Sequence, residues 1–177
     1  FGVGGEVATT EPAVGAHQAH LTDSDWHRTV ECTDCHLVPN TPPHASGMID
    51  MDWGGPSANG GTKPVFSSLD LTCAGTYCHG NSLPGPIPGG VVSRTPVWTV
   101  VDGTYDGCGD TCHTNPPADP HPASTACPTC HTAVIAAYAA GNPPTVAWKD
   151  HTKHVDGKTD VIGLTCTSCH GDPISQD

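Results

Sequence analysis

The cysteines and histidines of this chain follow one spacing rule. Its ten cysteines form five close pairs, and a histidine directly follows the second cysteine of each pair. The five sets are Cys32, Cys35 and His36; Cys73, Cys78 and His79; Cys108, Cys112 and His113; Cys127, Cys130 and His131; and Cys166, Cys169 and His170. Two thiols at this spacing can add across the vinyl groups of a haem, and the adjacent histidine then lies under the iron as its proximal ligand. The pattern therefore predicts five covalently attached haem groups.

Two of the five pairs are wider than the usual C-x-x-C-H pattern. The pair that begins at Cys73 has four residues between its cysteines and the pair that begins at Cys108 has three, with Gly75 and Gly109 in the gaps. A wider gap loops out one or two residues but leaves the second cysteine and its histidine adjacent. We therefore expect the iron ligand to be the same at all five sites.

Other uses of paired cysteines explain less of the pattern. Disulfides would suit an exported chain with an even number of cysteines, but they give no reason for a histidine after every second cysteine. Zinc sites use C-x-x-C knuckles without needing an adjacent histidine. Thioredoxin-like redox pairs occur singly on a βαβ unit. A disulfide-bonded or zinc-binding module is therefore the weakest alternative.

Seven histidines remain once the five proximal ones are assigned. Five of them would be needed if every iron takes a second imidazole on its other side, so two would have no ligand role. The seven are His17, His20, His27, His44, His121, His151 and His154. The sequence leaves open which two are spare.

An internal repeat favours two of these histidines. We interpret residues 1–177 as a single domain, in which a Pro/Gly-rich linker over residues 81–97 joins similar halves at about residues 17–80 and 113–171. Each half has an H-x-x-G-x-x-D segment between two attachment sites. His44 and His154 begin these segments, and we expect both to be distal ligands.

Local sequence favours three more. His121 follows a proline-rich stretch that favours a rigid extended arm, which can carry an imidazole between haems. His17 and His20 are three residues apart, so they would share one face of a helix and could serve two neighbouring haems. The predicted distal set is therefore His17, His20, His44, His121 and His154.

The composition argues against an ordinary hydrophobic core. Val, Ile, Leu and Phe together make up 28 of the 177 residues, whereas Gly and Pro number 21 and 18, and the net charge is −12. A chain with so few core-forming residues and so much charge would ordinarily be disordered. We therefore expect a mostly irregular coil with a few short helices and little strand, wrapped around five stacked haems. The clearest expected elements are a helix over Cys127–Gly141 and a short strand over Val97–Val101.

These motifs resemble the multihaem c-type cytochromes of metal-reducing bacteria. The similar segments include Gly15–Leu21, Cys32–His36 with the following Val38 and Pro39, and Cys73–Gly80. Asn115–Pro122 and His154–Gly157 also match. The resemblance implies electron transfer outside the cytoplasm, bis-histidine haems and an irregular fold on stacked porphyrins. Some members of the family polymerise into extracellular filaments, in which an N-terminal histidine can ligate a haem of the neighbouring subunit.

The sequence therefore favours an electron-transfer protein over an enzyme. Iron with two histidine ligands offers a substrate no open position, whereas a multihaem reductase needs one haem with an open distal face. We expect an extracellular or cell-surface conduit, possibly polymerised into a filament through an N-terminal histidine. A soluble periplasmic shuttle is the alternative.

Charge and hydropathy limit the partners. The excess of acidic residues disfavours nucleic acid, and no run of 18 apolar residues is available to span a membrane. The chain begins at Phe1 without a charged and then apolar leader, so we expect a mature form whose targeting segment lies outside this numbering. The expected partners are redox proteins or an extracellular electron acceptor.

Overall fold

The computed structural model describes residues 2, 4–38, 49–83, 94–107, 111–117, 121–141, 143–161 and 163. Within these residues the chain is mostly turn and coil. The elements in chain order are α1 (His17–Leu21), η1 (Cys32–Asp34), η2 (Gly55–Gly61), β1 (Val65–Ser67), β2 (Thr72–Ala74), α2 (Cys127–Cys130), β3 (Ile135–Ala139), β4 (Thr145–Trp148) and η3 (His151–Lys153), where η marks a 3₁₀ helix. The expectation of a mostly irregular fold with few short helices and little strand is confirmed.

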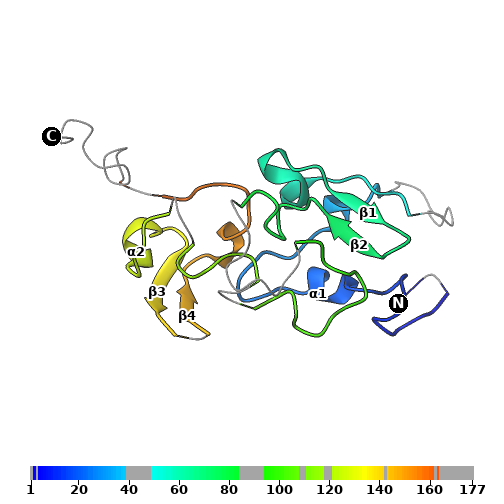
Figure 1. The fold of residues 1–177 in the computed structure, drawn as a ribbon, viewed down its shortest axis with the longest axis horizontal. Helices are drawn as coiled ribbons and strands as arrows, with labels where there is room; N and C mark the ends of the chain where they lie inside the picture. The colour runs from blue at the N-terminus through cyan, green and yellow to red at the C-terminus, as the bar shows by residue number, and fades with distance from the viewer. Residues whose placement is uncertain are drawn as a thin grey trace.

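The four strands form two separate hairpins at opposite ends of an elongated molecule (Figure 1). Strand β1 pairs antiparallel with β2, and β3 pairs antiparallel with β4. Helix α1 lies near the first hairpin, and α2 lies beside the second (Figure 1). The long irregular segments between them therefore make up most of the molecule.

The predicted helix over Cys127–Gly141 is wrong beyond its first turn. Helix α2 ends at Cys130, because His131 has φ −103° and ψ 43°, outside the helical region. The alanine-rich stretch that follows is strand β3, which pairs with β4 in the register Ile135↔Trp148 and Tyr138↔Val146. The β-branched and aromatic residues of β4 suit a strand, so pairing with β4 overrides the helix propensity of the alanines.

The predicted strand over Val97–Val101 is reduced to a single bridge. Val97 pairs with Thr72 as an isolated antiparallel bridge, and the chain turns at Trp98. The backbone N–H of Trp98 donates to the carbonyl of Leu71, and that of Cys73 donates to the carbonyl of Pro96. This segment therefore adds a short third edge beside β2. Residues 84–93 of the predicted linker lie outside the described residues.

The condition on which His17 and His20 would share a helix face is met, because both lie on α1. The helix follows one of the few packed segments of the protein. Among the described residues only three hydrophobic side chains are buried, namely Val14, Ala16 and Val134, which expose 9%, 8% and 6% of their surface. Burying a valine contributes about 1.5–3 kcal/mol, whereas fixing the backbone of one residue costs about 1–2 kcal/mol. The described part of the polypeptide therefore lacks a core large enough to hold it folded.

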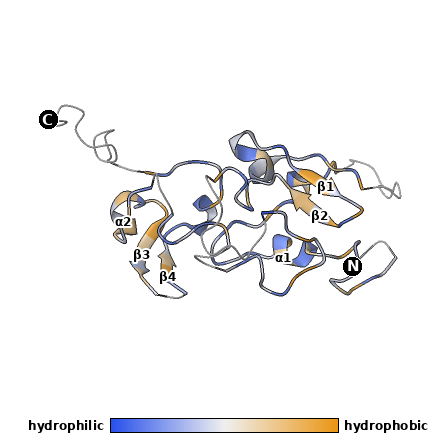
Figure 2. Ribbon diagram, viewed as in Figure 1, coloured by the Kyte–Doolittle hydropathy of each residue, from blue (hydrophilic) through white to orange (hydrophobic). Residues whose placement is uncertain are grey.

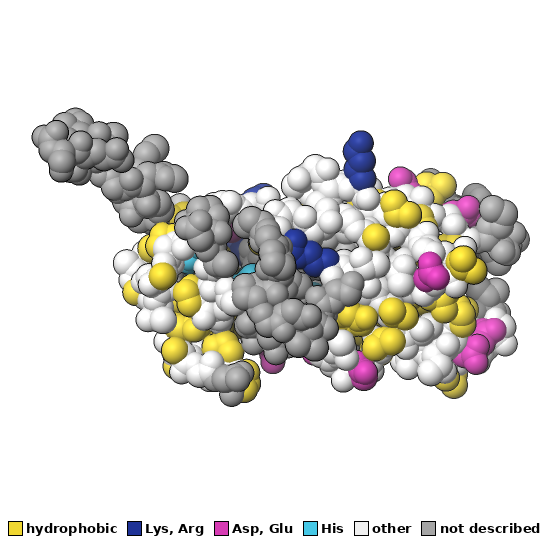
Figure 3. Space-filling view, in the orientation of Figure 1, with side chains coloured by type: hydrophobic (Ala, Val, Ile, Leu, Met, Phe, Trp, Pro, Cys, Tyr) yellow, Lys and Arg dark blue, Asp and Glu magenta, His cyan; other side chains and the backbone are white. Residues whose placement is uncertain are grey.

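Apolar side chains instead reach the surface. In the ribbon of Figure 2, the hairpins contain many of the hydrophobic residues, whereas α1 is mostly hydrophilic. Leu69 is 89% exposed, and Val7, Leu37 and Val65 are each exposed by 60% or more. In Figure 3 hydrophobic side chains are spread over the visible face among acidic ones. The fold thus presents apolar surface rather than enclosing it.

Candidate haem sites

Helix α1 orients two of the predicted distal histidines through its own backbone. The ring Nδ1 of His17 lies 2.8 Å from the carbonyl oxygen of Val14, and that of His20 lies 2.8 Å from the carbonyl oxygen of Ala16. A carbonyl oxygen only accepts hydrogen bonds, so Nδ1 of each ring carries the proton and donates it. Nε2 is then the basic nitrogen of each ring, and it can bind a metal ion.

The structure brings predicted proximal and distal histidines together in four pairs. Four of the five predicted proximal histidines are described, and each faces one predicted distal histidine. The pairs and their ring-centroid separations are His17–His36 at 6.1 Å (site I), His20–His79 at 6.2 Å (site II), His113–His154 at 6.2 Å (site III) and His121–His131 at 6.0 Å (site IV). The partners come from segments between 10 and 59 residues apart in the sequence. Local chain geometry alone therefore does not explain the pairs.

These separations match the spacing of two imidazoles on opposite sides of one metal ion. A bond from a transition-metal ion to an imidazole nitrogen is about 2.0–2.1 Å long, which places the centroids of two opposed rings about 6.3 Å apart. All four pairs lie within a few tenths of an ångström of this value. Stacked aromatic rings in van der Waals contact can come closer, with centroids about 4.5–7 Å apart. The narrow range across four unrelated pairs is what a common bridging atom would require.

The hydrogen bonds of the paired rings also favour metal binding through Nε2. Besides His17 and His20, five paired histidines have Nδ1 near a backbone carbonyl oxygen. These are His36 with Asp50 at 3.3 Å, His113 with Thr114 at 2.7 Å, His121 with Pro122 at 2.8 Å, His131 with Asp160 at 3.2 Å and His154 with Trp26 at 3.0 Å. Metal-bound histidines usually donate their second ring N–H in this way, which fixes the tautomer and the ring orientation.

Desolvation keeps several of these imidazoles neutral. It lowers the pKa of His79 to about 4, and neighbouring histidines lower it further in the same direction. Desolvation also lowers the pKa of His20, and in site III it lowers the pKa of His154. Only a neutral imidazole can donate its Nε2 lone pair to iron. The lowered pKa values thus favour the neutral, metal-binding form of His20, His79 and His154.

Seven of the ten cysteines lie in the described residues, and none of those seven forms a disulfide. Burial raises the pKa of Cys35 to about 12 and the pKa values of Cys73 and Cys78 to about 11. A catalytic redox pair needs a thiol whose pKa is lowered. These cysteines are therefore unsuited to thioredoxin-like chemistry, whereas each described pair adjoins one of the imidazole pairs.

An open cleft coincides with site III. Both imidazoles, His113 and His154, line it together with the thiol-bearing Cys112. Trp26 and Trp148 supply much of its apolar wall. Cofactor pockets commonly have mostly apolar linings with a few polar groups. The cleft brings a predicted attachment cysteine, two predicted iron ligands and apolar side chains around one space, which is the set of groups that a haem site requires.

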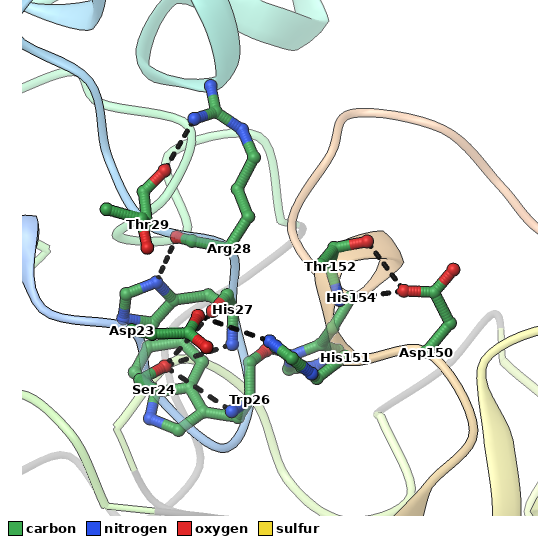
Figure 4. Close-up of polar contacts among 10 residues, drawn as sticks. All are labelled: Asp23, Ser24, Trp26, His27, Arg28, Thr29, Asp150, His151, Thr152 and His154. Carbon is green, nitrogen blue, oxygen red and sulfur yellow. Dashed lines mark hydrogen bonds and ion pairs between the residues drawn. The ribbon is translucent and has the colours of Figure 1, made fainter.

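Two spare histidines lie close to this cleft, and their environments differ (Figure 4). His151 turns Nε2, the nitrogen that would ligate, toward Asp23 Oδ1 at 3.4 Å. His27 resembles the paired histidines, because its Nδ1 lies 2.6 Å from the carbonyl oxygen of Arg28. No described proximal histidine is paired with His27. The two histidines therefore differ in their suitability as ligands. Nε2 of His151 faces a carboxylate, whereas the ring of His27 is oriented as a ligand would be.

Several predicted site residues fall outside the described residues. They are His44, Cys108, Cys166, Cys169 and His170. The fifth predicted site and the proposed equivalence of His44 with His154 therefore remain predictions from the sequence.

The four described sites follow one another along the molecule. Electrostatic interactions link Cys35 of site I to Cys73 and Cys78 of site II, and Cys78 in turn to Cys112 of site III. Site III reaches site IV through the second hairpin. Trp148 contacts His154 at a centroid distance of 4.7 Å and pairs with Ile135, which follows His131 by four residues. These contacts connect sites I to IV in the order in which their proximal histidines occur in the sequence.

Sequence reasoning did not identify the tryptophans beside the imidazoles. Trp98 contacts His17 and His20 at centroid distances of 4.8 and 5.8 Å, and Trp26 and Trp148 contact His154 at 6.1 and 4.7 Å. The available signal was compositional: the chain has four tryptophans but only two phenylalanines.

An ion pair within the first attachment segment was also missed. Asp34, between the two cysteines of site I, is buried and accepts from Arg28 Nη2 at 3.0 and 2.8 Å through its two carboxylate oxygens. Its Oδ2 also accepts the backbone N–H of Glu31 at 2.8 Å. These contacts hold the turn of η1 on which Cys32 and Cys35 are presented.

Comparisons with family models, with curated proteins and with solved structures find no match for this chain. Across the described ranges, no helix has the length and apolar character that crossing a membrane demands. In the same residues, no group of three or more His, Cys, Asp or Glu side chains could hold a bare metal ion. Each imidazole pair supplies two ligands, which is the number that haem iron takes from the protein at its axial positions.

Proposed function

We propose that this chain transfers electrons through five covalently attached haems, each with two axial histidines. The observation that carries the proposal is the set of four imidazole pairs, each formed by a histidine from an attachment motif and a second, distant histidine at 6.0–6.2 Å. Haem supplies the redox chemistry, because its iron can take up and release one electron. The protein's part is to hold the iron ligands and to keep the sites close together.

The arrangement of ligands favours transfer over catalysis. A substrate needs an open coordination position and nearby groups that handle protons. Each predicted proximal histidine in the described residues has a second imidazole with its ring centroid 6.0–6.2 Å away, which supports two axial ligands and no open position at sites I to IV. A multihaem reductase would need its open haem at the remaining site.

The proposal includes export and a place outside the cytoplasm. Thioether attachment in bacteria occurs beyond the cytoplasmic membrane, so the chain would have to be exported before the haems are attached. Within that setting we favour an extracellular or cell-surface conduit over a periplasmic shuttle. The linear order of sites I to IV supports a conduit, because an electron entering at one end would pass each site in turn.

Polymerisation into a filament is the finer part of this proposal and rests on the family resemblance. The structure limits how such a contact could form. His17 and His20 each already face a proximal histidine of their own chain, so neither is available to a neighbouring subunit. His27 has a ligand-like orientation and is paired with none of the four described proximal histidines, which makes it the N-terminal candidate for such a contact.

The test is spectroscopic and uses the native haem-loaded protein. We expect five haems per chain, all low-spin in both oxidation states, reversible reduction without substrate, and no binding of carbon monoxide. A high-spin haem in the protein as isolated, or stoichiometric carbon monoxide binding, would overturn the electron-transfer assignment in favour of an enzyme. Light scattering separates the finer alternatives, because a strictly monomeric protein contradicts the filament.

A further inference from the structure

We propose that Trp98 is a positioning residue that sets the imidazole planes of two distal ligands at once, those of sites I and II. The inference rests on the proposed function, because it concerns how two iron ligands are held. His17 and His20 both contact the Trp98 ring, but with different geometry. His17 meets it edge-on, with an angle of 89° between the rings, whereas His20 lies nearly parallel to it at 24°.

Both ends of the tryptophan are fixed. Its indole N–H donates to the carbonyl of Pro12 at 2.8 Å, which ties the ring to the segment before α1. Its backbone N–H donates to the carbonyl of Leu71, beside the β2 strand that carries Cys73. The residue therefore connects an attachment cysteine of site II with the helix that carries both distal ligands.

The backbone at residues 14–16 leaves space for the Trp98 ring. Gly15 has φ +44°, a conformation that favours glycine, and a Cβ atom there would collide with the Trp98 indole. The flanking Val14 and Ala16 are buried, and their carbonyls accept the Nδ1 protons of His17 and His20. The ring thus covers the backbone groups that orient the two imidazoles, as well as touching the imidazoles themselves.

Sites I and II differ in the angle between their two imidazole planes. The imidazole planes of site I are 32° apart and those of site II are 68° apart. The g-values of low-spin ferric haem depend on this angle, because the ligand planes set the energies of the iron orbitals. Displacing Trp98 should therefore change the signals of two haems, not one.

The experiment compares haem-loaded variants by electron paramagnetic resonance after haem content has been measured. In Trp98→Ala we expect all five haems to remain attached, while the signals of two of the five shift or broaden. Gly15→Ala should affect the same two signals, because the added methyl group displaces the ring. The matched control is Trp148→Phe, which should alter one different signal, since Trp148 contacts only His154 among the described histidines.

The outcomes separate this inference from the function on which it rests. A wild-type protein without attached haem would refute the proposed function. Five attached low-spin haems with unchanged signals in both Trp98→Ala and Gly15→Ala would refute the role of Trp98 alone. A change in one signal only, or in all five equally, would also refute it, because the structure places the ring against two ligands.

Discussion

Replacing His154 by alanine should leave the iron of site III without its distal ligand, while the ligands of the other irons stay unchanged. Its imidazole lies 6.2 Å from that of His113, and it lines the cleft of site III. The side chain is exposed, and its Nδ1 bonds only to the carbonyl of Trp26, which water can satisfy after the substitution. The variant therefore removes an iron ligand without removing buried packing, and we expect it to fold.

The size of the effect follows from the number of sites. One of five irons loses its distal ligand, so about a fifth of the haem should change from low-spin to high-spin. His154 lines an open cleft, so removal of its imidazole leaves that side of the iron accessible to a diatomic molecule. Titration of the reduced variant with carbon monoxide should therefore reach an end point at about one equivalent per chain, whereas the wild-type protein should bind none.

His151→Ala is the matched control. It lies three residues from His154 on the same 3₁₀ turn, but its Nε2 faces Asp23 at 3.4 Å. We expect this variant to keep all haems low-spin and to bind no carbon monoxide. The ligand assignment would be refuted if His151→Ala created the high-spin haem while His154→Ala remained fully low-spin.

Three further predictions concern stability. Burial and, in the haem-loaded protein, iron ligation keep the His79 imidazole unprotonated, so the unfolded chain binds the proton more readily and the free energy of unfolding should fall as the pH drops from 6.5 to 4; urea unfolding that is unchanged or more difficult at pH 4 contradicts this. Arg28→Gln leaves the buried Asp34 carboxylate unpaired and should cost about 1–3 kcal/mol in urea unfolding. Lys153→Gln removes an exposed ion pair at 3.8 Å and should lower the free energy of unfolding by at most about 0.5 kcal/mol. Equal losses in Arg28→Gln and Lys153→Gln would contradict the larger contribution of the buried pair. Replacing all ten attachment cysteines by serine should give a disordered chain by circular dichroism, and cooperative unfolding of that chain would contradict a fold that depends on its cofactors.

The sequence was sufficient to predict features that depend on neighbouring residues. The spacing of His17 and His20 predicted that they would share a face if their segment were helical, and that segment is helix α1. The shortage of aliphatic residues predicted an irregular fold, and the described residues bury only three hydrophobic side chains. In both cases the physical cause is local or compositional, so no knowledge of distant contacts was needed.

Features that depend on distant contacts could not be predicted in this way. The stretch after His131 is alanine-rich and reads as a helix, but its pairing with β4 makes it a strand. The internal repeat identified His154 as a ligand candidate, but only the folded chain shows that it faces His113, 41 residues earlier. The contact of Trp98 with both histidines of α1 spans about 80 residues and leaves no periodic signal in the sequence.

The most direct test of the central claim is the intact mass of the native protein together with its iron content. We predict the 18.2 kDa polypeptide plus the mass of five haems, with five irons per chain that stay bound after denaturation, because thioether bonds hold each porphyrin. The mass of the bare polypeptide, less ten hydrogens for five disulfides or accompanied by zinc that a chelator removes, would contradict the account.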